Sequence, residues 1–384
     1  MKPIRNLYFI LLTVIFLSCT TGPSKKEQAI VTPPVAIEPS GEEFLTEDYL
    51  TIIAVGDNLY HDVMIKAGEE GDYETAYLEI KPLIQNADLA FINQETLLAG
   101  KNFGFSGYPS FNSPQNMGRA LAASGFNVIN HATNHVMDKG EEALIATMDF
   151  WDSYSDVTIL GIHRSRESRS LPVLLKKNNI TVGFLSYTYG TNAIPLPKDK
   201  PYMVSLIDTE IMSNEINALR PLCDFLIVSM HWGEEYKHEI SKSQEDLAAM
   251  LAKHDVDLVI GHHPHVIQKI EKLIKQDGKN MLCYYSLGNL ISAQTQNATL
   301  LGAMAFVRIK KTKGNATPVI EKYGAIPLVT HYEKDFSGFK VYPLYAYNEE
   351  LAEKHWKTGL TMDYLKELSA GIFGEREITG NPFE

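Results

Sequence analysis

The sequence has little cysteine, no long basic stretch and no internal repeat. It holds 3 cysteines in 384 residues, and Cys223 and Cys283 lie in apolar segments, which favours buried free thiols over a disulfide. The formal net charge is −12. Because proteins bind nucleic acid through clustered positive charge, this composition argues against a nucleic-acid partner.

An apolar run long enough to cross a membrane is also missing. Lys2 and Arg5 precede a run from Leu7 to Leu17, and Cys19 follows after a small residue. A spanning helix needs roughly 20 apolar residues, whereas this arrangement is typical of a secretory signal of the bacterial lipoprotein type. We predict that residues 1–19 are such a signal and that Cys19 is lipidated. The protein would then be an extracytoplasmic, membrane-anchored lipoprotein, with plain secretion or a retained signal anchor as alternatives.

The remaining chain divides into a linker and a large domain. Residues 20–48 are rich in Pro, Ser, Thr, Lys and Glu and have no apolar period, which predicts a flexible linker. The rest is long enough for one α/β domain with a substantial core. We predict this domain over residues 49–330, with residues 331–384 as a β and helical extension of it.

Six short apolar runs end in residues that suit metal binding or proton transfer. They are TIIAV before Asp57, LAFI before Asn93 and Glu95, FNVIN before His131, Asn134 and His135, DFLIVSM before His231, DLVI before His262, His263 and His265, and MLCYYS before Asn289. Such runs, separated by helix-length stretches, predict strands of a mostly parallel sheet. Open sheets carry their sites beyond the carboxyl ends of the strands, so we expect these side chains to converge.

Other segments predict the elements around these strands. Helices are expected at 62–70 and 73–86, and a hairpin is expected from 171–176 and 181–187. An amphipathic last helix is expected at about 348–370.

The segment from Gly261 to His265 gives the strongest single indication of a site. Pro264 disfavours helix at His263, and in an extended segment His263 and His265 would face the same side. Both could bind one metal or two neighbouring ones, whereas His262 would point away. A solvated polar turn is the alternative, but three imidazoles at the end of an apolar run favour ligation.

Further candidates follow the other strands. Asn134 offers a neutral oxygen ligand, although it could simply cap a helix, and His135 could donate a proton. Asp138 could be a cap or could orient a histidine. Asp57 is a candidate ligand, Glu95 could be a carboxylate between two ions, and His231 could be a ligand at a buried strand end. His61 could be either a ligand or a surface residue. Asn93 is also a possible site residue, although asparagine at such a position more often stabilises a turn.

The donor set mixes nitrogen and oxygen and lacks thiolate. It comprises Asp57, Glu95, Asn134, His231, His263 and His265. Such a set suits Mn, Fe or Zn better than a closed structural zinc site, and six donors exceed what one tetrahedral ion needs. We therefore expect two divalent ions that activate water for hydrolysis. Arg164, Arg166 and Arg169 share a polar loop, for which we favour a solvated surface over an anion site.

The order of these motifs resembles a known family. Gly56-Asp57, Asn93-x-Glu95, Asn134-His135-x-x-Asp138, His231-Trp232-Gly233-x-Glu235-Tyr236, His263-Pro264-His265 and Ser286-Leu287-Gly288-Asn289 together resemble the CapA family of capsule-synthesis proteins associated with poly-γ-glutamate. These proteins look like relatives of the calcineurin-type metallophosphoesterases. The resemblance implies a four-layer α-β-β-α sandwich with mixed sheets and the site at the sheet ends.

The resemblance also implies roles for the candidate ligands. Asn134, His231 and His263 would bind one metal, Asp57 and His265 the other, and Glu95 would bridge them. The related phosphoesterases open with Asp-x-His and bridge with aspartate, whereas here Asn58 and Leu59 follow Asp57. One ligand is therefore missing unless His61 replaces it.

Two main hypotheses about function follow. The first is an exported, lipid-anchored hydrolase of a phosphoester or amide in capsule or cell-envelope polymer metabolism, with His135 protonating the leaving group. Its partners would be an anionic envelope polymer or its precursor and membrane-bound synthase or export proteins. The second is a non-catalytic component of a polymer synthesis or export complex, and a degenerate phosphoesterase scaffold is a third possibility.

Overall fold

The computed structural model describes residues 47–69, 73–312 and 317–384. The predicted signal, the lipidation of Cys19 and nearly all of the predicted linker lie outside the described residues. The first strand begins at Glu47, inside the segment predicted as linker.

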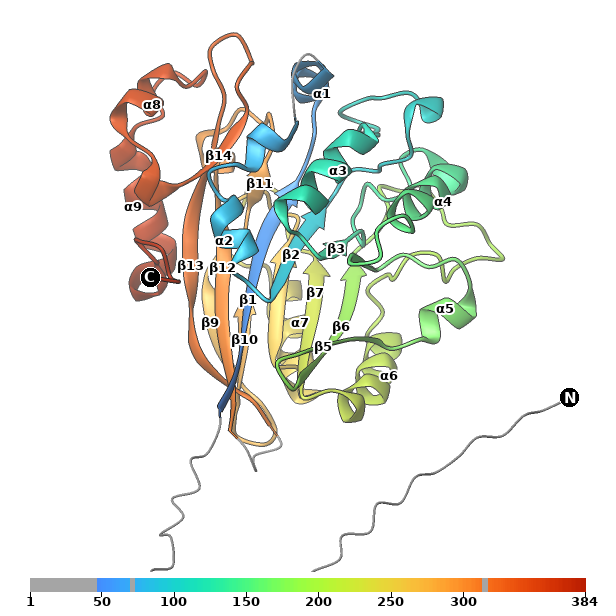
Figure 1. Cartoon of the computed structure of the whole chain (residues 1–384). Coiled ribbons are helices and arrows are strands. Elements are labelled where there is room, and N and C mark those ends of the chain that lie inside the picture. Colours follow the sequence, from blue (N-terminus) through green and yellow to red (C-terminus); the bar gives the residue numbers. More distant parts are fainter. Residues whose placement is uncertain (1–46, 70–72, 313–316) are drawn as a thin grey trace, which may run out of the picture. The chain divides into compact units, whose positions relative to one another are not determined.

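The first sheet has 8 strands, parallel in one half and antiparallel in the other (Figure 1). Its strands are β1 (Glu47–Asn58), β2 (Leu89–Gln94), β3 (Val128–Asn130), β4 (Thr158–Leu160), β11 (Asn289–Ile291), β12 (Leu301–Thr312), β13 (Val319–His331) and β14 (Lys340–Pro343). The order is β14-β13-β12-β1-β2-β3-β4, and the short β11 pairs with the end of β1. Strands β1 to β4 are parallel, whereas β12, β13 and β14 pair antiparallel.

The second sheet has 6 strands in the order β5-β6-β7-β8-β10-β9. They are β5 (Val173–Lys177), β6 (Ile180–Thr188), β7 (Phe225–His231), β8 (Leu258–His262), β9 (Ile270–Ile274) and β10 (Asn280–Tyr284). The four central strands are parallel, and each edge strand is antiparallel to its neighbour. The predicted hairpin is confirmed as β5 and β6.

The helices connect the strands and cover the outer faces. They are α1 (Asp62–Glu69), α2 (Lys81–Gln85), α3 (Gln115–Ser124), α4 (Gly140–Trp151), α5 (Arg166–Ser170), α6 (Thr209–Leu219), α7 (Lys242–Lys253), α8 (Glu349–Lys354) and α9 (Met362–Phe373). Side chains cap several of them: Asp208 accepts from two backbone amides at the start of α6, and Ser241 and Gln244 form a capping box on α7.

Two long predicted helices are wrong because each is interrupted. The segment 73–86 forms a 3₁₀ turn at Tyr73–Tyr77 and then the short α2, which starts where Pro82 can occupy the first turn. The last predicted helix is divided into α8 and α9. Between them His355 forms a bridge with Glu333, and Gly359 has a φ of 83°, a value that favours glycine.

The side chains of β7 point alternately to the two faces of the second sheet and show how the layers pack. Phe225 and Ile227 belong to the large core that also holds residues of the first sheet, such as Ile53. Leu226 and Val228 instead pack with α6 and α7 on the outer face of the second sheet. Figure 1 shows α2 and α3 in front of β1 and β2, on the opposite side. The predicted four-layer α-β-β-α arrangement with two mixed sheets is therefore confirmed.

The carboxyl-terminal segment packs on the same core. Tyr332, Val341 and Leu365 are buried in the cluster that contains Ile326 of β13.

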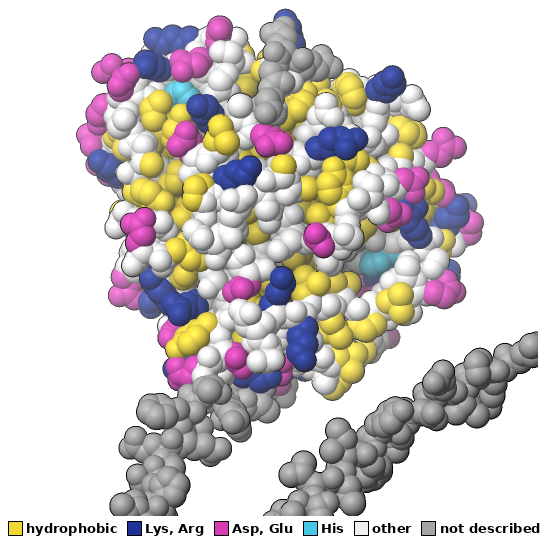
Figure 2. All heavy atoms as spheres, in the orientation of Figure 1, with side chains coloured by type: hydrophobic (Ala, Val, Ile, Leu, Met, Phe, Trp, Pro, Cys, Tyr) yellow, Lys and Arg dark blue, Asp and Glu magenta, His cyan; other side chains and the backbone are white. Residues whose placement is uncertain are grey.

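Among the described residues, Cys223 and Cys283 are free thiols, as predicted. Figure 2 shows acidic and basic side chains interspersed over one face, with apolar groups between them. No helix in the described ranges is long and apolar enough to cross a bilayer.

Candidate functional site

The predicted convergence of strand ends occurs, but between two sheets instead of along one. Asp57 and Asn93 end strands of the first sheet, and His231 and His262 end strands of the second. Across the gap, Asn93 Nδ2 lies 3.4 Å from His231 Nδ1, and His262 Nδ1 lies 3.6 Å from an Asp57 oxygen. The candidate side chains thus come together where the carboxyl ends of both sheets meet.

Asp57 is held at this junction by close backbone packing. A side chain on Gly56 would collide with the carbonyl of Gly288, and that close approach lets the Asp57 amide donate to the same carbonyl at 2.8 Å. The Asp57 carboxylate accepts from Asn93 Nδ2 at 2.7 Å and lies 3.0 Å from His265 Nδ1. Burial opposes ionisation of Asp57, but the contact with His265 holds its pKa below the ordinary value.

His265 lies between two carboxylates that favour its protonated form. Burial alone lowers the pKa of His265, but the carboxylates of Glu95 and Asp57 raise it to about 9. Asn289 Oδ1 lies 3.0 Å from the same Nδ1 that faces Asp57. Imidazole Nε2 is therefore the atom of His265 that is directed toward Glu95, at 3.9 Å from Oε1.

Glu95 is the centre of the arrangement. Its carboxylate is buried, and neither oxygen has a hydrogen-bond partner among the described residues. Oε1 lies 3.9 Å from His231 Nε2 and 3.9 Å from His265 Nε2. Burial raises the pKa of Glu95 well above its ordinary value. A buried carboxylate without a hydrogen bond among the described residues is costly, and its position between two imidazole nitrogens suits a carboxylate that would bridge two cations.

On one side of Glu95 lie neutral nitrogen and oxygen donors. His231 Nε2 is 2.8 Å from Asn134 Oδ1, and the rings of His231 and His263 are 4.9 Å apart. His263 Nδ1 has no partner among the described residues. Burial lowers the pKa of His231 well below its ordinary value and that of His263 to about 3. Neutral imidazole is the form that binds metal ions.

His263 and His265 reach the site by a different route from the predicted one. They were expected to share a face of an extended segment, but their φ angles are 96° and 59°. Two left-handed residues around Pro264 form a tight loop, and the two ring centroids lie 5.9 Å apart. Such backbone is strained for residues with a side chain and is concentrated at functional sites. His262, expected to point away, stacks on Phe91 between the sheets.

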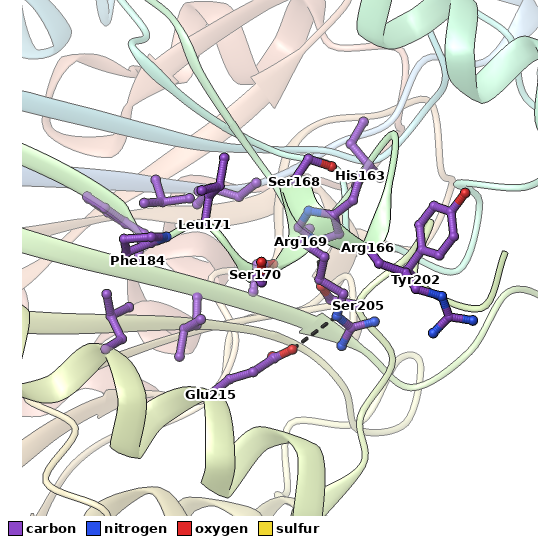
Figure 3. Close-up of a pocket in the computed structure, with 18 of the residues that line it drawn as sticks. His163, Arg166, Ser168, Arg169, Ser170, Leu171, Phe184, Tyr202, Ser205 and Glu215 are labelled. Atoms are coloured by element: carbon purple, nitrogen blue, oxygen red, sulfur yellow. Dashed lines mark hydrogen bonds and ion pairs between the residues drawn. The ribbon is translucent and has the colours of Figure 1, made fainter.

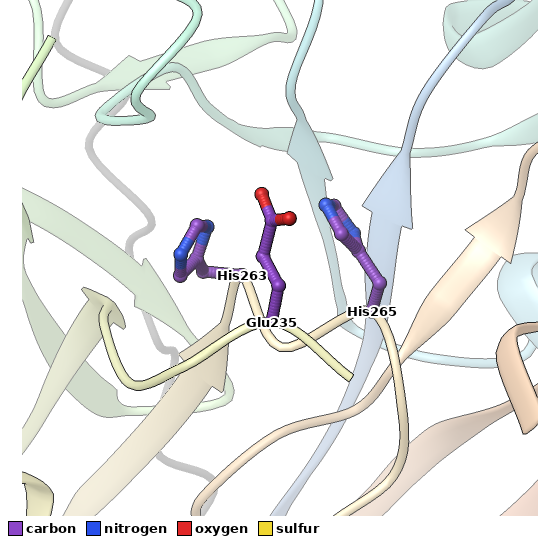
Figure 4. A group of neighbouring side chains, drawn as sticks. All are labelled: Glu235, His263 and His265. Atoms are coloured by element: carbon purple, nitrogen blue, oxygen red, sulfur yellow. The ribbon is translucent and has the colours of Figure 1, made fainter. Parts of the chain in front are cut away.

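Glu235 is a site residue that the sequence analysis quoted only as part of a motif. Its carboxylate and the donor atoms of His263 and His265 lie within 4.8 Å of one another (Figure 4). A second group with the same spacing consists of Asp57, Glu95 and His265. Glu235 is exposed and follows the turn at Gly233, where φ is 88°. The indication in the sequence was a carboxylate two residues after that glycine and four after His231.

The other possible ligands have different roles. His61 belongs to neither donor group, because its Nδ1 faces the carbonyl of Leu59 and the amide of Ala293, each at 3.3 Å. Asn93 does not stabilise a turn but links Asp57 to His231, and Asn130 Nδ2 donates to its oxygen at 2.6 Å.

His135 is oriented by Asp138. The His135 Nδ1 and Asp138 Oδ2 atoms are 2.7 Å apart, and the backbone amide of Phe111 donates to that same oxygen at 2.7 Å. The Phe111 ring packs edge-on against the imidazole, with centroids 4.7 Å apart. Asp138 is therefore a partner of a histidine, one of the two roles predicted for it, and it leaves Nε2 of His135 available to a substrate.

The residues fit a two-ion centre. The donors on one side of Glu95 are neutral imidazoles and an amide oxygen, and those on the other side are carboxylates and His265. Together with the buried carboxylate of Glu95, these are the donor types that Mn, Fe and Zn share. A cation on either side of Glu95 would neutralise its charge.

Comparison with known proteins places this chain among capsule-synthesis proteins. The family model described as "Bacterial capsule synthesis protein PGA_cap" matches residues 51–294. The chain is 25% identical over 270 residues to the PGA biosynthesis protein CapA of Bacillus subtilis, covering 69% of each chain. It is 25% identical over 344 residues to the capsule biosynthesis protein CapA of Bacillus anthracis, covering 83% of this chain and 80% of that one.

The chain is also similar to solved structures. One is a phosphatase from Mycoplasma pneumoniae, with 15% identity and a TM-score of 0.44, covering 74% of this chain and 95% of that one. Another is the calcineurin-like phosphoesterase YfkN of Bacillus subtilis, with 16% identity and a TM-score of 0.42, covering 73% and 91%.

Proposed function

Since this chain belongs to the bacterial capsule synthesis protein family PGA_cap, we propose that it acts in the biosynthesis of a capsule or cell-envelope polymer as a metal-dependent hydrolase. The bond cleaved would be a phosphoester or an amide of an anionic polymer of the poly-γ-glutamate type, or of its precursor. The names of the two Bacillus relatives support the pathway, and the donor geometry supports the chemistry.

The position of Glu95 is the observation on which the hydrolase proposal depends. A buried carboxylate that no described residue hydrogen-bonds, 3.9 Å from both His231 and His265, has no structural benefit on its own. A purely structural core would replace it with an apolar side chain. Two bound cations would turn this cost into binding energy.

The residues divide into two ligand sets around Glu95. Asn134, His231 and His263 would hold one ion; Asp57, His265 and Glu235 would hold the other. Glu235 thereby supplies the ligand expected from His61. When bound, such ions supply Lewis acidity and an activated water for hydrolysis.

The protein's own contribution to catalysis centres on His135. Asp138 fixes the imidazole through Nδ1, so that Nε2 can carry the proton that the leaving group needs. Asn93 keeps Asp57 and His231 in place, because it bonds the first and contacts the second. Tyr189, with its ring 4.6 Å from that of His263, forms part of the wall.

The setting of the reaction follows from the amino terminus and the charge. We propose an exported protein anchored by lipid on Cys19, which would meet the polymer outside the cytoplasm beside membrane-bound synthase or export proteins. A net charge of −12 repels a polyanion, so cations at the centre would give the polymer its point of attachment. In membrane fractions, Cys19→Ala should release the protein, and retention of that variant would contradict lipid anchoring.

One experiment separates a hydrolase from a non-catalytic component of a polymer complex. Metal content is measured by elemental analysis of the full chain, and turnover is screened with phosphoesters and γ-glutamyl amides. His135→Ala should keep about two metal equivalents and lose at least about 100-fold in kcat. Metal binding without turnover in the wild type would favour the complex component. Absence of metal after reconstitution would exclude the metallohydrolase.

A further inference from the structure

A second cavity lies apart from the metal centre. It has a volume of about 790 Å³ and shares no residue with the two metal-donor groups. Its walls come from the end of β4, the loop carrying α5, strand β6 and helix α6. This volume is within the range of small-molecule sites. The loop predicted to be a solvated surface also lines this cavity: Arg164 and Arg166 are exposed, and Arg169 is half-buried.

The cavity has an apolar end and a polar end (Figure 3). Leu171 and Phe184 lie at one end of the view, and Arg166 and Tyr202 lie at the other, with Arg169 between them. Leu171 is 66% exposed although it lines the cavity, and Leu222, another lining residue, is 52% exposed. Apolar side chains left uncovered in this way would gain from a ligand that covers them.

Arg169 at the polar end keeps a hydrogen-bond donor that no described residue satisfies. Arg169 donates through Nε to Glu215 Oε1 at 3.0 Å, and Glu215 Oε2 is already taken by the hydroxyl of Tyr187 at 2.7 Å. Arg169 Nη2 is buried and has no hydrogen-bond partner among the described residues. An unsatisfied buried donor on a charged group is costly, and an anionic acceptor would remove that cost.

The neighbouring groups add to this preference for an anion. Arg166 stacks on the Tyr202 ring at 5.6 Å and forms no ion pair within the described ranges. Arg164 is different, because Asp149 and Asp152 accept from it at 2.8 and 2.6 Å. His163 hydrogen-bonds Ser205, and burial lowers its pKa to about 4, so the charge at this end comes from arginine.

We propose that this cavity binds an amphipathic anion, whose carboxylate or phosphate head pairs with Arg169 and Arg166 and whose apolar chain covers the exposed Leu171 and Leu222. The unpaired Nη2 and the exposed leucines are the two independent observations that carry the proposal. It does not depend on the proposed hydrolase function.

The test is isothermal titration calorimetry of the full chain with octyl phosphate, octanoate and 1-octanol. At least one of the two anions should bind at a single site about tenfold or more tightly than the alcohol, because only an anion forms the charge-assisted bonds. The tighter of the two anions identifies the head group. Equal binding of all three ligands, or binding of neither anion, would overturn the proposal.

Variants assign the binding to this cavity. Arg169→Met should reduce anion affinity to that of octanol, whereas Arg308→Met, an ion-paired arginine of β12 outside the cavity, should leave it unchanged. If Arg169→Met does not fold, Ala218→Trp provides a second test, because Ala218 is exposed on α6 and lines the cavity. The bulkier side chain should weaken all three ligands. Unchanged anion affinity in the variant tested would refute the assignment.

Discussion

Two groups of buried histidines occupy different parts of this protein, and only one of them has the composition of a metal centre. At the strand ends, His231, His263 and His265 surround the unpaired carboxylate of Glu95. Near the carboxyl terminus, His331 and His355 are equally buried, with ring centroids 5.3 Å apart. Burial and clustering of imidazoles are therefore common to both groups and do not identify a site.

The difference lies in the carboxylates beside the rings and not in the rings themselves. His355 Nε2 faces the carbonyl of Thr330 at 3.1 Å and its Nδ1 accepts from the Lys357 amide at 2.8 Å. His331 Nδ1 is 2.8 Å from the hydroxyl of Tyr347. His331 Nε2 and His263 Nδ1 each lack a hydrogen-bond partner among the described residues, so unsatisfied imidazole nitrogens occur in both groups. The carboxylate near His331 Nε2, that of Glu333 at 3.6 Å, is half-exposed, whereas Glu95 is buried and its oxygens have no hydrogen-bond partner among the described residues. What distinguishes the group at the strand ends is therefore a buried charge without hydrogen bonds.

The largest expected effect comes from removing that charge. Glu95→Gln should lose at least one of the two expected metal equivalents, because the amide cannot bridge two cations. Glu333→Gln, the matched change beside the other histidine group, should bind as much metal as the wild type. Elemental analysis after reconstitution measures both. Full metal content in Glu95→Gln would mean that Glu95 is not a bridging ligand.

The stability of the metal-free protein should depend more on the histidine group near the carboxyl terminus than on the group at the strand ends. In the metal-free protein, His355→Ala should lower the free energy of unfolding by about 2–4 kcal/mol, because it removes satisfied hydrogen bonds and aromatic packing. His263→Ala should cost about 1 kcal/mol less than His355→Ala, because both variants lose ring packing but His263 Nδ1 has no hydrogen bond to lose among the described residues. Urea denaturation of both variants gives the comparison. Equal losses would show that the two groups do not differ in this way.

Acid should destabilise the protein through His355. Burial lowers the folded-state pKa of His355 to about 4, whereas in the unfolded chain it is about 6.5. The unfolded state therefore binds more protons between these values, so this contribution is complete above pH 6.5 and is lost as pH falls toward 4. Between pH 7 and 5, His355→Asn should lose about 1–2 kcal/mol less stability than the wild type. Urea denaturation of both proteins at pH 7 and pH 5 measures this. If the wild type and His355→Asn lose the same free energy of unfolding between the two pH values, the prediction is wrong.

The sequence predicted which side chains converge better than it predicted the path of the chain. Asp57, Glu95, Asn134 and His231 each follow an apolar run, and such runs must end at a common edge if their strands are parallel. That argument does not depend on which sheet each strand joins. It therefore holds although the strands are distributed over two sheets. Apolar periodicity gives burial, not pairing partners, and the two-sheet arrangement was expected only from the family resemblance.

Other features of the fold and of the candidate site were not predicted from the sequence. The left-handed backbone at His263 and His265 arises from the tight loop around Pro264, and local preferences predicted extended chain there. Glu235 lies in an exposed loop, where an acidic residue is normally solvated. The break between α8 and α9 depends on the bridge of His355 to Glu333, a contact between distant segments. The predicted domain boundaries, signal and lipidation stay predictions.

The smallest expected effect concerns a single hydrogen bond. Tyr347→Phe removes the hydroxyl that pairs with His331 Nδ1 at 2.8 Å and leaves the surrounding aromatic packing in place. The free energy of unfolding should fall by about 1 kcal/mol, the usual net contribution of one such bond. Metal content should not change, because His331 and His355 belong to neither candidate donor group. A loss of metal in Tyr347→Phe would show that the two groups are coupled, and the distinction between the two histidine groups would then fail.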